Sequence, residues 1–329
     1  MAFQSSARER LTEITDDILN PDASFVTGVE KLHSLFQCVS DPAVKRHEIS
    51  RRVDGGGSAI SPMQAAECLL DHARTKTFLR GIYRALHELQ RRFPGERISV
   101  VYAGSGPFAS LAIPLATQFR PDEIAFHVLD IHPFSLKNVR SLVEIFGLEE
   151  YFVDFINADA TTWKPSFRPH LIFTETMDKG LCYEPQAHIT ANLGGEIRQN
   201  GLFLPESIHV EAIMTPSRVD FPVRVLGTAV QLTPASAQNM RFDIRKSFPI
   251  PDVELRESHD LLLRTRVGVF GKEQILEGEA RITEWILLDT ISRGGGVLEL
   301  QYGLGGLIGD IRKRVEQEFF HSLLDRIDQ

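Results

Sequence analysis

The feature that most restricts the fold of this chain is an apolar run that ends in two closely spaced glycines. Ile98 to Tyr102 has the β-branched, apolar composition of a buried strand. Gly104 and Gly106 follow it, and a helix is predicted from about Phe108. A strand, a glycine turn and a helix in this order are typical of an α/β domain whose backbone approaches a nucleotide cofactor closely.

An acid follows the next strand of the predicted sheet. Ile124 to Leu129 reads as that strand, and Asp130 at its tip is placed to accept hydrogen bonds from ribose hydroxyls. The glycine turn, GSGPFA, lacks the third glycine of a dinucleotide fingerprint, which counts against a pyrophosphate on the helix N-terminus. The pattern favours a cofactor with adenosine and no phosphate, S-adenosylmethionine. Asp159, after the strand-like run Tyr151 to Asn157, could meet its adenine amino group.

Two further acids flank a turn later in the chain. Leu171 to Phe173 reads as a buried strand, and Glu175 follows at its carboxyl end, where open α/β sheets place their ligands. Lys179 and Gly180 supply a turn, so the segment can fold back as a hairpin and bring Glu184 opposite Glu175. Converging carboxylates repel each other unless a cation lies between them, and a planar guanidinium fits such a fork. The alternative is a pair of solvated loop acids.

A long helix is predicted before the glycine turn. Ser61 and Pro62 supply a hydroxyl cap and a proline in the first turn, and a bend is expected near residues 75–77. Asp71 and Arg74 are three residues apart and therefore share one face of this helix. The alternative to a functional role is a surface ion pair of small energetic consequence.

The remaining sequence predicts helices before this domain and strands after it. Residues 1–57 read as two amphipathic helices followed by a linker, the glycine-rich stretch RRVDGGGS, and they could serve as a dimerisation element. Residues 58–205 form the predicted Rossmann-like domain. Residues 206–329 contain β-rich runs separated by turn residues, which indicates a β-barrel or sandwich, and residues 310–327 read as a C-terminal helix.

Composition narrows the choice of partners. The 329 residues suffice for one large or two ordinary domains. A net charge of −8 disfavours nucleic acid as a partner and gives no reason to expect binding to anionic membranes. The three cysteines form no CxxC pair, so neither a zinc site nor a disulfide framework is indicated. The sequence shows no signal peptide and no apolar run of membrane-spanning length, and a cytoplasmic location is therefore expected.

Several of these motifs resemble those of the protein arginine N-methyltransferases, a superfamily of class I S-adenosylmethionine-dependent enzymes. The acidic hairpin, with Met177 inside it, is similar to the family's double-E hairpin, and LLDHARTKTF resembles the helix before its cofactor domain. VVYAGSG resembles the first cofactor motif, and GLFLPESIHVEAI the crossing into the barrel. Thr283-Glu284-Trp285 stands where the family has a Thr-His-Trp loop. The resemblance runs from about residue 62 to residue 285.

The resemblance implies an α/β Rossmann-like methyltransferase domain followed by a β-barrel, and S-adenosylmethionine as the cofactor. The two hairpin acids would grip an acceptor guanidinium and draw its charge away from the attacking nitrogen, with no metal required. The residues implied at the cofactor are Arg74 for its carboxylate, Gly104, Gly106, Asp130 and Asp159. Those implied at the acceptor are the catalytic Glu175 and Glu184, with Met177, Glu284, Trp285 and Asp71 on the substrate side.

One departure from the family's motifs bears on the substrate. Glu284 replaces the histidine that usually pairs with the helix aspartate, so it would repel Asp71 unless a cation intervenes. The α-ammonium of a free amino acid is such a cation. The chain also lacks an obvious tyrosine-rich lid helix and dimerisation arm. It is therefore most similar to the bacterial enzymes that methylate free L-arginine, as in streptozotocin biosynthesis, with homodimerisation expected through residues 1–57.

Two other functions remain open. The first is methylation of arginine within proteins or peptides. The second is a methyltransferase fold kept as a binding module without turnover, although such a module would need neither of the hairpin glutamates nor Asp130.

Overall fold

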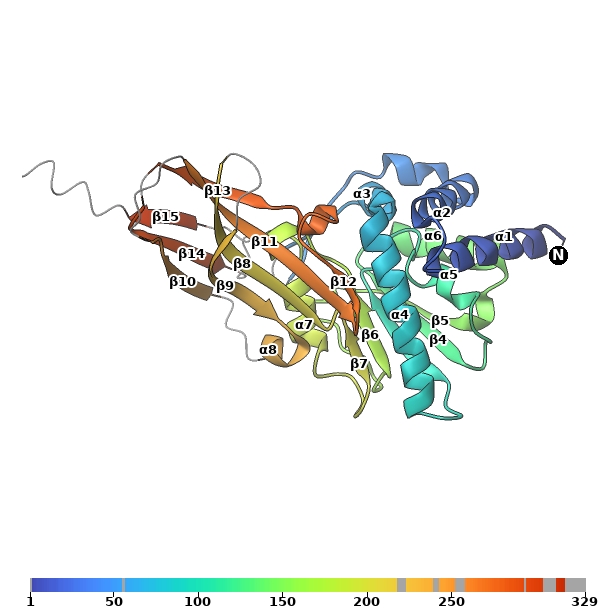
Figure 1. Cartoon of the computed structure of the whole chain (residues 1–329). Helices are drawn as coiled ribbons and strands as arrows, with labels where there is room; N and C mark the ends of the chain where they lie inside the picture. Colours follow the sequence, from blue (N-terminus) through green and yellow to red (C-terminus); the bar gives the residue numbers. More distant parts are fainter. Residues whose placement is uncertain are drawn as a thin grey trace, which may run out of the picture.

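The computed structural model describes residues 2–54, 57–217, 223–238, 243–251, 258–292, 294–303 and 312–316. A parallel sheet covered by helices adjoins a region of antiparallel strands, which confirms the predicted fold class (Figure 1). The described helices are α1 (Ala2–Leu19), α2 (Phe25–Val39), α3 (Pro62–Glu67), α4 (His72–Arg92), α5 (Ile113–Ala116), α6 (Pro133–Phe146), α7 (Gln186–Leu193) and α8 (Pro234–Gln238). Short 3₁₀ turns are η1 (Pro42–Arg46), η2 (Cys68–Leu70), η3 (Glu149–Tyr151), η4 (Lys179–Leu181) and η5 (Arg281–Thr283).

The parallel sheet has the strand order β5-β4-β3-β6-β7. Its strands are β3 (Ile98–Ala103), β4 (Ile124–Asp130), β5 (Phe152–Asn157), β6 (Leu171–Thr174) and β7 (Leu202–Leu204). Both faces are covered, since Val100 and Tyr102 of β3 join one hydrophobic cluster whereas Val101 and Ala103 join another. The order reverses at β3, so a crevice is expected at the carboxyl ends of β3, β4 and β6.

The N-terminal helices pack on this domain. The helices α1 and α2 lie against α4 and α6, while α7 covers the opposite face of the sheet (Figure 1). Side chains at the contact include the fully buried Leu11, Ile18 and Phe36. Arg80 of α4 donates to the carbonyl of Ile18 at 2.9 Å. Residues 1–57 therefore share a core with the parallel-sheet domain, and their part in dimerisation stays a prediction.

The helix predicted to begin at Ser61 is two helices. Ser61 and Gln64 form a capping box at the start of α3, as the cap signal predicted. The chain then passes through η2, and Asp71 caps α4 by accepting the Arg74 N–H at 3.5 Å. The predicted bend near residues 75–77 is thus placed too late, because a capping carboxylate at Asp71 starts a new helix.

The helix predicted after the glycine turn is also different. The chain runs through turns from residue 107, and only the four-residue α5 is helical. Ala109 has a φ of +40°, which interrupts helical geometry. Because this helix is so short and starts well after Gly106, it offers no developed dipole for a pyrophosphate.

The antiparallel region contains two described sheets. One has the order β12-β11-β8-β9 with β13 beside β11, and the other has the order β10-β14-β15. The bounds are β8 (Ser207–Pro216), β9 (Arg224–Leu232), β10 (Asp243–Pro249), β11 (His259–Phe270), β12 (Glu273–Ile275), β13 (Ile286–Ile291), β14 (Val297–Gly303) and β15 (Arg312–Glu316). The predicted C-terminal helix is wrong over residues 312–316, which pair with β14, and the rest of it lies outside the described residues.

The helix α4 joins the parallel-sheet domain to the antiparallel region. It packs on β11 and β12, and its Arg84 pairs with Glu273 at 3.0 Å. A two-stranded ribbon, β1 (Arg51–Arg52) and β2 (Ser58–Ala59), precedes α3. Within the described part of the chain, no helix has both the length and the hydropathy needed to cross a membrane.

Candidate functional site

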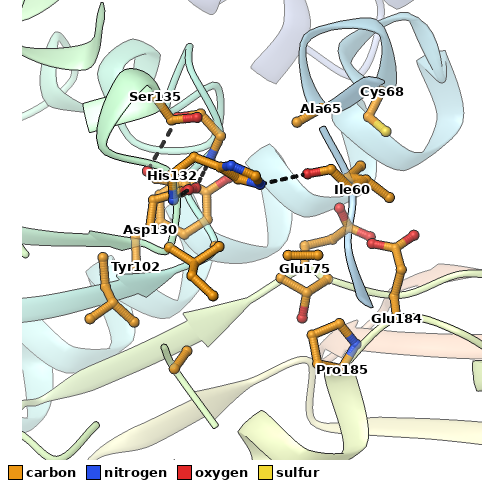
Figure 2. Close-up of a pocket in the computed structure, with 18 of the residues that line it drawn as sticks. Ile60, Ala65, Cys68, Tyr102, Asp130, His132, Ser135, Glu175, Glu184 and Pro185 are labelled. Atoms are coloured by element: carbon orange, nitrogen blue, oxygen red, sulfur yellow. Dashed lines mark hydrogen bonds between the residues drawn. The ribbon is translucent and has the colours of Figure 1, made fainter. Parts of the chain in front are cut away.

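A pocket lies where the carboxyl ends of β3, β4 and β6 meet. Its empty space, including the open mouth, is about 920 Å³, within the range of small-molecule sites. Figure 2 shows Asp130 and His132 on one wall and the two acids of the hairpin opposite. The sequence-predicted residues that line it are Arg74, Gly104, Gly106, Asp130, Asp159, Glu175 and Glu184.

The glycine turn holds the carboxylate at the tip of β4. Gly104 and Gly106 both have positive φ, +79° and +62°, a region that favours glycine. Gly106 donates its N–H to Asp130 at 2.8 Å, and His132 donates its N–H to the other carboxylate oxygen at 2.8 Å. Burial raises the pKa of Asp130 to about 6, and these two hydrogen bonds oppose that rise.

Gly104→Ala is expected to disrupt this wall of the pocket. A Cβ there would collide with the Thr176 methyl group, besides adopting an unfavourable φ, so we expect the variant to lose stability and affinity for any ligand of the glycine turn. Gly147→Ala is the matched control, because Gly147 has φ +62° but nothing within 4 Å of its Cβ position. Thermal unfolding of both variants checks this: an equal loss in the two would contradict the collision.

Asp159 anchors a strap over the pocket. One of its oxygens accepts the N–H and the hydroxyl of Thr161, and the other accepts the Asp54 N–H at 2.6 Å. On the second strand of the ribbon, Ser58 donates its N–H to the carbonyl of Tyr183 at 2.9 Å. The ribbon β1–β2 therefore reaches from the third strand's acid to the acidic hairpin.

This strap was missed in the sequence, where RRVDGGGS reads as a linker. Val53 and Ile60 line the pocket, and the Ile60 carbonyl accepts a hydrogen bond from the His132 ring at 3.0 Å (Figure 2). A signal was present in the glycines: Gly57 has φ +97° and its Cβ position is 3.0 Å from the Tyr183 carbonyl. A close approach of two backbones selects glycine as readily as a flexible linker does.

Arg74 pairs with the first hairpin acid. Its guanidinium contacts one carboxylate oxygen of Glu175, and both side chains are largely buried, at 14% and 3% exposure. The other Glu175 oxygen, Oε1, is buried without a hydrogen-bond partner among the described residues. A buried carboxylate oxygen without a donor is costly, so this site is set up to receive one more donor.

The second acid, Glu184, lines the same pocket close enough for the Arg74 charge to act on it. Burial raises the pKa of Glu184 to about 7, Arg74 opposes that rise, and Asp178 adds to it. The hairpin that holds both acids is tied by Asp178, whose carboxylate accepts the N–H groups of Tyr183 at 3.1 Å and Glu184 at 3.3 Å. Both acids therefore line one pocket with Arg74, whose guanidinium pairs with Glu175.

The raised pKa of Glu184 predicts a pH-dependent stability. Between its ordinary pKa of 4.5 and about 7, the folded chain keeps a proton that the unfolded chain releases, so the free energy of unfolding falls as pH rises through this window. The raised pKa of Asp130 also makes the free energy of unfolding fall as pH rises, but this contribution is the same in the parent and in a Glu184→Gln variant. Urea unfolding at pH 5 and pH 8 should therefore show a weaker loss of stability in Glu184→Gln than in the parent. Equal losses would contradict the burial of this carboxyl group.

The substrate-side residues predicted from the resemblance lie outside the pocket lining. Met177 is a core side chain at 1% exposure. Asp71 accepts the main-chain N–H of Arg281 at 2.8 Å. Glu284 pairs with Lys179 at 3.0 Å on the surface, and Trp285 is 39% exposed.

Tyr102 is a pocket residue that no sequence pattern singled out. It lies near the carboxyl end of β3, beside the glycine turn. Burial raises the pKa of its hydroxyl, which hydrogen-bonds Ser110. Its ring stacks on Phe173 at 4.3 Å. An apolar strand position reads as core from sequence, and Tyr102 serves both core and pocket.

Comparisons with known proteins support the fold. A scan against models of known families and a search of curated proteins each gave no match. Among solved structures, the chain is similar to one described as the Trypanosoma brucei PRMT1 enzyme–prozyme heterotetrameric complex with AdoHcy. The two are 13% identical, the match covers 76% of this chain and 95% of the other, and the TM-score is 0.52. The chain therefore shares the fold of a chain in that complex.

Proposed function

We propose that this protein is an S-adenosylmethionine-dependent N-methyltransferase that acts on the guanidino group of free L-arginine. The observation that carries the proposal is the guanidinium of Arg74 seated against Glu175, in a pocket that Glu184 also lines. A buried carboxylate that accepts the chain's own guanidinium, with a second carboxylate on the same pocket, has the charge to accept a substrate's guanidinium.

The pocket fits S-adenosylmethionine. Glycines with positive φ allow its backbone to approach a ligand, and Asp130 offers its carboxylate at the expected ribose position. Arg74 is a cation for the methionyl carboxylate. The similar trypanosomal complex was solved with AdoHcy, which supports the same choice. When bound, the cofactor supplies an electrophilic methyl group.

The residues of the fork perform the remaining tasks. A guanidinium is protonated at ordinary pH and its nitrogen lone pairs are delocalised, which makes it a poor nucleophile. Glu175 and Glu184 would each accept N–H donors from one side of the acceptor, which fixes its orientation and draws positive charge away from the free nitrogen. Arg74 leaves Glu175 for the cofactor carboxylate in this arrangement, and the vacated oxygen joins Oε1 in binding the acceptor.

Free arginine is favoured by the charges beside the hairpin. Lys179 lies between the two acids in sequence and Glu284 pairs with it at 3.0 Å, with about half of each side chain exposed. A free amino acid carries an α-carboxylate and an α-ammonium, which complement Lys179 and Glu284 in turn. A peptidyl arginine has neither charge, so Lys179 and Glu284 would add nothing to its affinity.

Binding to a set of guanidines tests the proposal. In the presence of AdoHcy, titration calorimetry should show L-arginine binding more tightly than agmatine, which lacks the carboxylate, and than an arginine peptide blocked at both ends. Glu284→Gln and Lys179→Met should reduce this preference without changing the affinity for AdoHcy. Tighter binding of the peptide would move the protein to the protein-modifying class, and binding of AdoHcy alone would favour a module without turnover.

A further inference from the structure

Three consecutive residues of β11 occupy a gap between two strands on one edge. On that edge β13 pairs with residues 259–263 and β12 with residues 267–270. Arg264, Thr265 and Arg266 lie between these stretches, where residues 276–285 leave the sheet as a loop. This 276–285 loop carries η5 and ends at Trp285.

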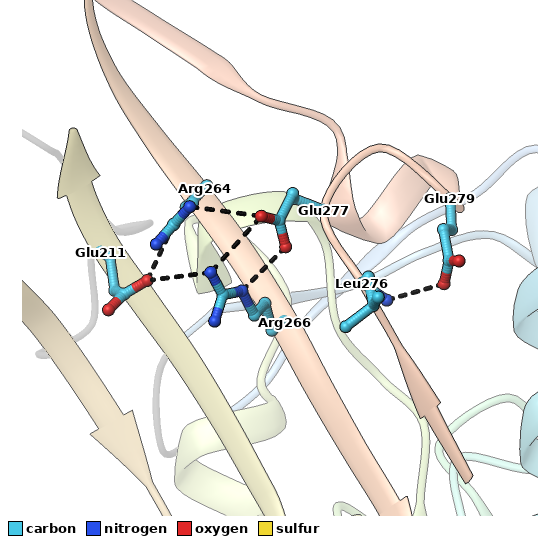
Figure 3. Close-up of polar contacts among 6 residues, drawn as sticks. All are labelled: Glu211, Arg264, Arg266, Leu276, Glu277 and Glu279. Atoms are coloured by element: carbon cyan, nitrogen blue, oxygen red, sulfur yellow. Dashed lines mark hydrogen bonds and ion pairs between the residues drawn. The ribbon is translucent and has the colours of Figure 1, made fainter. Parts of the chain in front are cut away.

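The two arginines hold the start of the loop. Arg264 donates to Glu277 at 3.2 Å and to Glu211 of β8 at 2.8 Å, and Arg266 donates to Glu277 at 2.8 Å. Figure 3 shows both guanidiniums between the two glutamates. Arg264 is buried at 9% exposure, whereas the Arg266 side chain is 39% exposed. The loop is closed on itself by the Gly278 N–H, which donates to the Thr283 carbonyl at 2.9 Å.

The middle residue holds the acidic hairpin. Thr265 points to the opposite side of the strand from the arginines, is 1% exposed, and accepts the Gly180 N–H at 3.0 Å. Gly180 is the turn residue between Glu175 and Glu184, with φ +69°. A Cβ on it would meet Ile286 and Leu263, so the turn is in close contact with β13 and β11.

The second half of the 276–285 loop contacts the start of α4, the helix that carries Arg74. Arg281 donates its N–H to Asp71 at 2.8 Å, and the other Asp71 oxygen accepts the Arg74 N–H at 3.5 Å. Arg74 in turn pairs with Glu175. The same short segment of β11 therefore fixes the hairpin directly and the start of α4 through the loop.

We propose that Arg264-Thr265-Arg266 is the positioning element of the acceptor fork. It rests on the proposed function, because it explains how the antiparallel region sets the spacing between the two glutamates and Arg74. None of its three residues lines the pocket, so they act through Gly180 and Glu277 rather than on the substrate.

Two conservative variants test this. Thr265→Val keeps the shape of the side chain and removes the acceptor of the Gly180 N–H, and Glu277→Gln keeps the loop side chain but removes its charge. We expect kcat for guanidine methylation to fall about tenfold in Thr265→Val, with the Kd for AdoHcy unchanged. Thr215→Val, on β8 opposite Asp260, is the matched control and should retain its kcat.

A readout without turnover separates this inference from the proposed function. By hydrogen–deuterium exchange, the peptide around residues 176–184 should exchange faster in Thr265→Val, and that around residues 276–285 faster in Glu277→Gln. Unchanged exchange in both, or a kcat loss no larger than that of Thr215→Val, would overturn the positioning role. If the parent methylates no guanidine, the proposed function fails, while the exchange result still decides whether β11 holds the hairpin.

Discussion

Glu175→Gln and Glu184→Gln should each lower guanidine methylation by roughly 10²–10³-fold. A neutral amide keeps the size of the side chain but loses the charge that holds a guanidinium and replaces one acceptor oxygen with a donor. The effect should appear mainly in kcat, because localising charge on the acceptor matters most as the methyl group is transferred. Initial rates at saturating S-adenosylmethionine measure it.

Cofactor binding provides the control for this prediction. The Kd for AdoHcy should be unchanged in Glu184→Gln. In Glu175→Gln it should be unchanged or lower, since Arg74 no longer has to leave a carboxylate to bind the cofactor. Asp178 stabilises the hairpin rather than the acceptor, so Asp178→Asn should cost stability more than specificity. Full turnover in either glutamate variant, with intact AdoHcy binding, would rule out the fork as the acceptor site.

Arg264→Ala should destabilise the antiparallel region substantially. Arg264 bridges Glu211 and Glu277, and its side chain is 11% exposed. Its removal leaves two partly exposed carboxylates, Glu211 and Glu277, with Arg266 as their remaining arginine partner among the described residues. Breaking a fully buried charge network costs about 3–5 kcal/mol, and the partial exposure of the two glutamates lowers the expected loss to about 2–3 kcal/mol. Urea unfolding at neutral pH measures the change.

Arg266→Ala is the matched control within the same cluster. Arg266 is 39% exposed and lies 3.8 Å from Glu211, so solvent screens its pairing and the loss should be about 1 kcal/mol or less. Equal losses in the two variants would show that burial does not decide the strength of this cluster. A loss of stability at low pH is also expected in the parent. Burial raises the pKa of Glu277, but its hydrogen bonds and the two arginines outweigh burial and hold the pKa below its ordinary value, so protonation at low pH removes this pairing.

Local patterns predicted the strands of the parallel sheet and several of the charged and glycine residues that line the pocket. The strands β3, β4 and β6 follow from apolar runs, and the positions of Gly104, Asp130 and Glu175 follow from the carboxyl ends of those strands. Each depends on a few neighbouring residues, so the sequence carries it directly.

Partners distant in sequence were not predictable in this way. Arg74 was expected at a cofactor carboxylate, yet it pairs with Glu175, and Glu284 pairs with Lys179. Such choices depend on which side chains the tertiary fold brings within a few ångströms, and no local pattern encodes them. The strap at residues 51–59 was missed for a related reason, because glycines that permit close packing look like those of a linker.

Mass spectrometry of methyl transfer tests directly whether this protein methylates the guanidino group of free L-arginine. L-arginine and an arginine-rich peptide are incubated separately with the full-length protein and S-adenosylmethionine, with the Glu184→Gln variant in parallel. We expect a methyl group on a guanidino nitrogen of the free amino acid, little methylation of the peptide, and little methylation of either substrate by the variant. Methylation of the peptide alone would contradict the free-arginine assignment, and methylation of neither substrate would contradict the assignment of a guanidine methyltransferase.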